Sequence, residues 1–146
     1  MDNNLNAQIE ELNNLWHNIM MKNNYTDIDK KYPRLKELSK NEISIIRIIS
    51  QREEVIIKEI GEIIQVPKST LTSIMDRLEK KNLIVRAMSS RDRRSYKLEL
   101  TEEGKKAQQE HIDFEYEFYG RIIKSLETYE DREEFLRLMK QISKNI

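Results

Sequence analysis

Two apolar helical stripes separated by a very short turn constrain the fold of this chain most strongly. The segment 67–82 carries four apolar residues at the i, i+3, i+4, i+7 spacing of one helix face, namely Leu71, Ile74, Met75 and Leu78. The segment 55–64 has its own stripe of isoleucines, and a helix there must end near Val66 because a residue before proline disfavours helical geometry. Pro67 suits the first turn of the second helix. Gly61 weakens a helix interior by about 1 kcal/mol relative to alanine, which indicates a close approach of another helix.

A short β-hairpin rich in basic residues is expected after these helices. The segment 83–88 is β-like, the segment 96–100 alternates apolar and polar side chains, and a polar turn lies between them. From Lys68 to Lys97 there are nine basic and three acidic residues, whereas the whole chain carries no net charge. Such a local surplus indicates an anion-binding surface, with an ordinary solvated surface as the alternative.

The rest of the chain is expected to be largely helical, because the chain contains only three glycines and two prolines. A first helix carries a heptad seam formed by Leu5, Ile9, Leu12, Trp16 and Ile19. Ser39 and Glu42 form the capping box of another helix. Thr101 caps a long helix, and Thr128 starts the last one. The segment 22–38 is expected to be a loop, with or without a short turn of helix.

Helix, tight turn, helix and hairpin together make a winged helix-turn-helix. The second of these helices carries Ser69, Ser73, Asp76 and Lys80 almost opposite its apolar stripe, with Thr72 and Arg77 on the flanks. Thr70 adds another short hydroxyl side chain. Short side chains let a helix enter a DNA major groove, where hydroxyls reach phosphates and base edges. A solvated helix face without DNA contacts is the alternative.

The chain resembles the MarR family (multiple antibiotic resistance regulators) in three stretches: "IGEIIQVPKSTLTSIMDRLEKKNLIVR", "DRR" and "KLELTEEG". The resemblance covers about residues 35–142, and the Asp-Arg-Arg wing followed by Leu-Thr-x-x-Gly is fairly specific. It implies a homodimer with two recognition helices in successive major grooves and two wings in minor grooves. It also implies repression, or sometimes activation, of nearby genes, relieved by a small aromatic or anionic effector. Asn82 stands where the family usually has glycine, and asparagine suits the same left-handed helix cap.

The resemblance also implies roles for single residues. Arg94 matches the arginine that enters the minor groove, and Asp92 matches the acid that stabilises the wing through an ion pair. The effector site of the family lies near Trp16, His17 and Met20, for which an ordinary place in the core is the alternative. The DNA-contacting set is then Pro67, Lys68, Ser69, Thr70, Thr72, Ser73, Arg77, Arg91, Arg93 and Arg94.

The sequence therefore predicts a mostly α fold with a β-hairpin wing and terminal dimerisation helices. Residues 1–38 and 104–146 are assigned to dimerisation, and residues 39–103 to binding a pseudo-palindromic double-stranded DNA operator. No nucleophile–base pattern, Gly-rich phosphate loop or metal-ligand spacing is visible, so neither an enzyme nor a metal or cofactor is expected. No membrane span or signal peptide is expected, which favours the cytoplasm. A winged helix used for protein assembly, and a constitutive DNA-binding protein without effector, are the alternatives.

Overall fold

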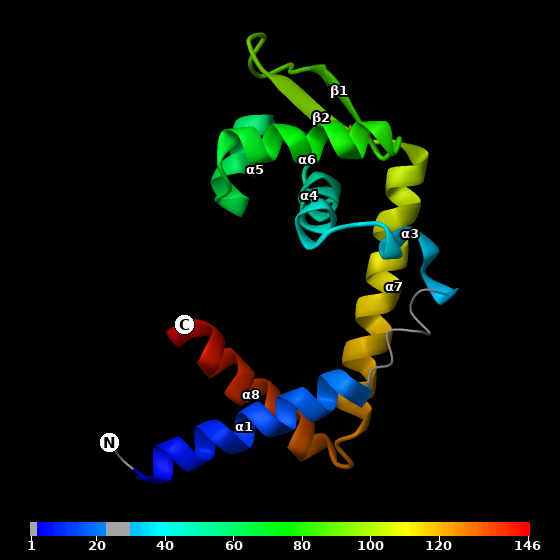
Figure 1. Ribbon diagram of the computed structural model, residues 1–146. Helices are drawn as coiled ribbons and strands as arrows, with labels where there is room; N and C mark the ends of the chain where they lie inside the picture. Colours follow the sequence, from blue (N-terminus) through cyan, green and yellow to red (C-terminus); the bar gives the residue numbers. More distant parts are fainter. Residues whose placement is uncertain (1–2, 23–29) are drawn as a thin grey trace. The chain divides into compact units, whose positions relative to one another are not determined.

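The computed structural model describes residues 3–22 and 30–146 (Figure 1). These residues divide into two compact units, Met1–His111 and Ile112–Ile146. The elements in chain order are α1 (Asn3–Lys22), α3 (Pro33–Lys36), α4 (Lys40–Ser50), α5 (Ile57–Ile64), α6 (Lys68–Lys80), β1 (Ile84–Met88), β2 (Tyr96–Leu100), α7 (Glu102–Lys124) and α8 (Tyr129–Asn145). The predicted fold, mostly helical with one antiparallel hairpin, is confirmed. Among the described helices, none is long and apolar enough to cross a membrane.

The core of the first unit lies where α4, α5 and α6 meet the hairpin. All four apolar residues of the predicted α6 stripe are buried, with Leu78 completely so. They pack in one cluster with isoleucines of α4 and α5 and with Ile84 and Leu98 of the hairpin. Burial of this face leaves the opposite face of α6 in solvent, and Figure 1 shows the hairpin lying along the same helix.

The turn between α5 and α6 is as tight as predicted, but α5 begins later than expected. A Cβ atom on Gly61 would lie 3.1 Å from Leu71 Cδ2, so α5 and α6 do approach closely there. Gln65 closes α5 in the left-handed conformation, and Pro67 is the N-cap of α6 rather than part of its first turn. The predicted helix start at residue 55 is wrong by two residues. The Val55 carbonyl accepts a hydrogen bond from Leu98 N–H at 3.0 Å, so this segment joins the edge of the hairpin instead.

Local sequence signals set the ends of the other elements as predicted. Ser39 and Glu42 form both hydrogen bonds of a capping box at the start of α4. Asn82 has a φ of 57°, the left-handed conformation expected after α6. The Thr101 hydroxyl accepts from Gly104 N–H at 3.0 Å and starts α7. Thr128 accepts from Asp131 N–H at 3.0 Å and starts α8. Of the predicted loop 22–38, residues 23–29 lie outside the described residues, and 33–36 form the short helix α3.

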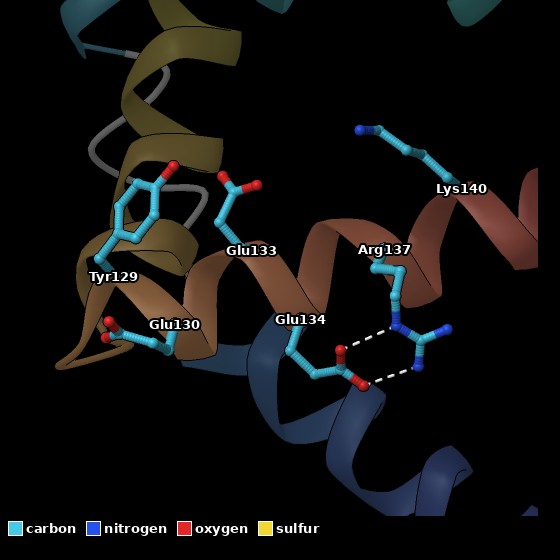
Figure 2. Close-up of a pocket in the computed structure, with 6 residues that line it drawn as sticks. All are labelled: Tyr129, Glu130, Glu133, Glu134, Arg137 and Lys140. Carbon is cyan, nitrogen blue, oxygen red and sulfur yellow. Dashed lines mark hydrogen bonds and ion pairs between the residues drawn. The ribbon is translucent and has the colours of Figure 1, made fainter.

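Two helices expose rows of apolar side chains in the single chain. In the first unit, every seam residue of α1 is at least 37% exposed. In the second unit, Leu138, Met139 and Ile142 of α8 are 43–49% exposed. A shallow hollow over the polar side of α8 is lined by Tyr129, Glu130, Glu133, Glu134, Arg137 and Lys140 (Figure 2). Its side chains all come from one helix, and Glu134 and Arg137 are paired with each other at 2.7 Å.

Candidate nucleic-acid interface

The outward face of α6 consists of small polar side chains at its N-terminal half. Every residue that the sequence assigned to DNA between 67 and 73 is exposed: Pro67, Lys68, Ser69, Thr70, Thr72 and Ser73. The Thr72 hydroxyl donates to the Lys68 carbonyl at 3.0 Å, which leaves its lone pairs open to a donor. The surface can therefore approach another molecule closely and offers both donors and acceptors.

An ion pair screens the negative charge of α6. Asp76 lies on the exposed face of this helix, where an unpaired carboxylate would repel a phosphate. Arg86 of β1 donates from Nη2 to Asp76 Oδ1 at 2.6 Å, and its Nε pairs with Glu79. The hairpin thus supplies the counter-charge for both acidic residues of α6.

The turn at the tip of the hairpin is closed by hydrogen bonds to Asp92. This carboxylate accepts from Arg94 N–H at 2.9 Å and from the Ser95 hydroxyl at 3.0 Å. The Arg94 amide, and then the Ser95 hydroxyl, hold the pKa of Asp92 below its usual value. Within the described part of the chain these hydrogen bonds take the place of the ion pair that was expected for Asp92.

Glu54, in the loop before α5, holds the start of the turn that joins β1 to β2. Its carboxylate accepts from the hydroxyls of Ser89 and Ser90 and from Ser90 N–H, the last at 3.1 Å. The two serine hydroxyls are the main reason why the pKa of Glu54 is lowered to about 2, with backbone N–H groups adding to the effect. Arg91 is drawn to the same place, because its Nη2 pairs with Glu59 at 2.9 Å. The sequence assigned Arg91 to contact with DNA. In the structure its ion pair with Glu59 helps to position the wing.

The sequence did not identify Glu54, Glu59 or Arg86 as functional residues. Glu59 has a local signal, because it accepts from Ile56 N–H three residues earlier, as an acid in a first helical turn often does. Glu54 and its serine partners are separated by 35 residues, so no spacing in the sequence could connect them.

Lys68, Lys80, Arg93 and Arg94 are cations of this surface that remain available. Their side chains are exposed and form no ion pair with any described residue. The neighbouring carboxylates Asp76, Glu54 and Asp92 are each occupied by donors of the protein itself. The arrangement presents positive charge at the hairpin tip and at the start of α6, with hydroxyls between, and so suits a polyanion with a repeating phosphate backbone.

A family model described as the MarR family matches residues 38–96 of this chain. The HTH-type transcriptional regulator YpoP of Bacillus subtilis is 35% identical over 98 residues, which cover 67% of this chain and 67% of YpoP. The chain belongs to the MarR family. It is therefore a helix-turn-helix transcriptional regulator.

A further regulator and two solved structures are also similar to this chain. SarZ of Staphylococcus aureus, also called an HTH-type transcriptional regulator, is 37% identical over 82 residues, but these cover only 54% of this chain and 55% of SarZ. The crystal structure of YusO from Bacillus subtilis matches all of this chain and 99% of its own, with a TM-score of 0.74 and 22% identity. FabT of Streptococcus pneumoniae, solved in complex with DNA, matches 96% of this chain and 95% of its own, with a TM-score of 0.77 and 22% identity. At such identities these two structures show the MarR-type fold.

The residues assigned to an effector lie together on α1. Trp16 is 54% exposed and His17 is exposed, whereas Met20 is half-buried. Trp16 is therefore no ordinary core residue of the single chain. Among the residues described here, no three histidine, cysteine or acidic side chains are grouped as they would be around a metal ion.

Proposed function

We propose that this MarR-family regulator binds a pseudo-palindromic DNA operator as a homodimer and represses transcription. In each subunit α6 enters a major groove and the hairpin tip enters the adjacent minor groove. One observation carries this proposal: the exposed hydroxyl face of α6 occurs together with Arg93 and Arg94, which form no ion pair with any described residue, while the acidic groups beside them accept hydrogen bonds from the protein itself. The DNA-bound relative FabT supports the same class of ligand.

We assign DNA binding and dimerisation to separate parts of the chain, with the boundaries that the sequence predicts. Residues 39–103 bind DNA, and residues 1–38 and 104–146 form the dimer. Support comes from the apolar side chains that α1 and α8 leave exposed. The protein acts in the cytoplasm, where the DNA is, and its function is regulation rather than catalysis.

Replacing Ser73 by glutamate tests the role of α6. The longer, negatively charged side chain would project from the exposed face towards the phosphates and base edges, so we expect specific binding to be abolished while the fold is retained. Ser50→Glu is the matched control, because it adds the same charge at an exposed helical serine of the same unit. Affinity is measured on a duplex that the wild-type protein selects from a random pool. Equal affinities of Ser73→Glu and Ser50→Glu would show that α6 does not approach the DNA.

We further propose that a small aromatic or anionic effector binds near Trp16, His17 and Met20 and weakens DNA binding. The exposure of an indole ring and of the imidazole next to it in the chain supports this place, because an aromatic face and ring N–H donors suit such ligands. Coupling free energies between two sites are typically about 1–3 kcal/mol. Titration of phenolic and anionic compounds is followed by Trp16 fluorescence and by DNA affinity. If neither signal changes with any compound, the constitutive regulator without effector is the better description.

A further inference from the structure

The helix α6 is tied to the start of α4 through one buried carboxylate. The Glu42 side chain is only 2% exposed, yet it carries a charge. Its Oε2 accepts from Ser39 N–H at 2.8 Å and from Lys81 Nζ at 3.0 Å, and its Oε1 accepts from Arg77 Nε at 3.2 Å. Lys81 also donates to the Glu37 carbonyl at 2.7 Å. A carboxylate this deeply buried is stable as an anion only because each oxygen has a donor.

These donors outweigh the cost of burial. Burial by itself raises the pKa of Glu42, but the hydrogen bonds from Ser39 N–H, Lys81 and Arg77 together leave that pKa below its usual value. Glu42 is therefore ionised whenever the protein is folded near neutral pH. Arg77 consequently has a permanent negative partner on the protein side of its guanidinium.

The contact uses only one edge of the Arg77 guanidinium. Nε donates to Glu42, whereas the two terminal amino groups have no hydrogen-bond partner among the described residues, and the side chain is 51% exposed. Arg77 follows Ser69 and Ser73 in the i, i+4 row of the exposed face of α6. A guanidinium is a rigid planar fork, so fixing one edge also fixes the direction in which the other edge points.

We propose that Glu42 is a positioning residue that determines specificity. It orients the two terminal amino groups of Arg77 for one contact with DNA and keeps Arg77 from making non-specific contacts with other phosphates. This inference rests on the proposed binding of α6 to DNA. A free arginine loses rotamer entropy when it becomes ordered, and the pair with Glu42 removes much of that loss for a single geometry. The same pair lowers the net positive charge of α6, which weakens attraction to phosphates in any other register.

The substitution Glu42→Gln removes the negative charge but keeps the hydrogen bond that caps α4. Glutamine can still accept from Ser39 N–H, so the capping box is kept. We expect the affinity ratio between the selected duplex and random duplex to fall about tenfold. We also expect the salt dependence of binding to random duplex to steepen by about one per subunit, because a released Arg77 can neutralise a phosphate in any position. A purely structural role would instead weaken both affinities together, without a steeper salt dependence.

Two further variants identify Arg77 as the group through which Glu42 acts. In an Arg77→Gln background, Glu42→Gln should no longer change the ratio, as a double-mutant cycle requires for two coupled residues. Arg77→Lys keeps the charge but lacks the planar guanidinium, which can bind Glu42 and DNA through different nitrogens. The affinity ratio between selected and random duplex should therefore fall about tenfold, while the salt dependence of binding should stay nearly unchanged. Arg77 is half exposed, so this variant is informative even if Glu42→Gln does not fold. Glu103→Gln, which removes the charge of an α7 glutamate that pairs with Arg34 of α3, is the matched control and should leave the ratio unchanged.

Three results would overturn the inference: an unchanged ratio in Glu42→Gln, an unchanged ratio in Arg77→Lys, or an equal effect of Glu42→Gln with and without Arg77. These results differ from failure of the proposed function. In that case the wild-type protein itself selects no duplex from the random pool.

Discussion

At the scale of single residues, this protein uses three carboxylates as hydrogen-bond acceptors that hold parts of its basic surface in place. Glu42 holds Arg77, Glu54 holds the start of the hairpin turn, and Asp92 holds the tip of that turn. A cation held in this way loses little further entropy on binding. Arg93 and Arg94, which form no ion pair with any described residue, supply general attraction instead.

Arg94→Ala should weaken binding to all DNA. The exposed side chain has no partner within the described residues, so its removal costs the fold little, whereas loss of a minor-groove arginine costs about 1–3 kcal/mol of binding. The slope of log affinity against log salt should fall by about one per subunit. Lys140→Ala removes an exposed cation of α8 and serves as the control. If Arg94→Ala and Lys140→Ala show the same slope and affinity as the wild type, the wing does not touch DNA.

Glu54 should make stability depend on pH in a defined direction. Its pKa in the folded protein is about 2, against 4.5 for an ordinary glutamate, because it accepts from Ser89 and Ser90. The charged form is favoured by folding, so the contribution is complete above pH 4.5 and is lost as pH falls towards 2. Glu54→Gln should therefore be less stable than the wild type near neutral pH, and the difference should shrink on acidification.

Urea unfolding of wild type and Glu54→Gln between neutral pH and pH 2 measures this difference. Glu53→Gln, a change at the exposed neighbouring residue, controls for the altered net charge. A difference between wild type and Glu54→Gln that does not vary with pH would contradict the assigned role of the carboxylate.

At the scale of elements, signals within a few residues of one another were sufficient to predict most of the structure. The α6 stripe, the caps at Ser39 and Thr101 and the left-handed Asn82 are local, and the structure confirms them. The start of α5 was predicted incorrectly because Val55 is hydrogen-bonded to Leu98 of the hairpin. These two residues are more than 40 positions apart in the sequence, so no local signal links them. The DNA-contacting residues themselves remain predictions, since the structure shows their exposure and not a contact.

Gly104, in the first turn of α7, lies against the backbone just before β1 and should not tolerate a side chain. A Cβ atom there would lie 2.0 Å from the Leu83 carbonyl oxygen, which is backbone and cannot move aside. Gly104→Ala should therefore lower the free energy of unfolding by about 3 kcal/mol or more, in the range of other severe packing defects. Gly120→Ala is the matched control in the same helix, because nothing described lies within 4 Å of its added Cβ.

The two alanine substitutions should change the free energy of unfolding in opposite directions. Gly120→Ala should stabilise the protein by about 0.5–1 kcal/mol through helix propensity alone. Chemical denaturation gives both values. Comparable stability of the two variants would show that the close contact between Gly104 and Leu83 is absent in solution.

At the scale of the whole molecule, exposed apolar residues require a partner for the single chain. Leu12 of α1 is 64% exposed and Ile142 of α8 is 49% exposed, and each belongs to a row of similar residues. Contiguous apolar rows of this kind mark an association surface. We expect a dimer at micromolar concentration, with a melting temperature that rises with protein concentration.

Charged substitutions within these rows test the dimer. Leu12→Glu or Ile142→Glu should shift sedimentation towards the monomer and lower the melting temperature, whereas Asn14→Glu, at an exposed polar position of α1, should not. A wild-type protein that sediments as a folded monomer would rule out the dimer.

The dimer, in turn, fixes the spacing of the DNA sequence that it selects. Two copies of α6 related by a twofold axis meet successive major grooves on one side of the duplex, so half-sites should lie about 10 base pairs apart. Insertion of about 5 base pairs between them turns the second half-site to the opposite side, and we expect affinity to fall to that of random DNA. Insertion of about 10 base pairs returns the second half-site to the same side of the duplex but places it farther from the first. Affinity should then recover only if the two copies of α6 can move farther apart. Gel-shift titration of the three duplexes measures these affinities. Equal binding to all three would mean that each subunit binds its half-site independently, and that dimerisation does not contribute to operator selection.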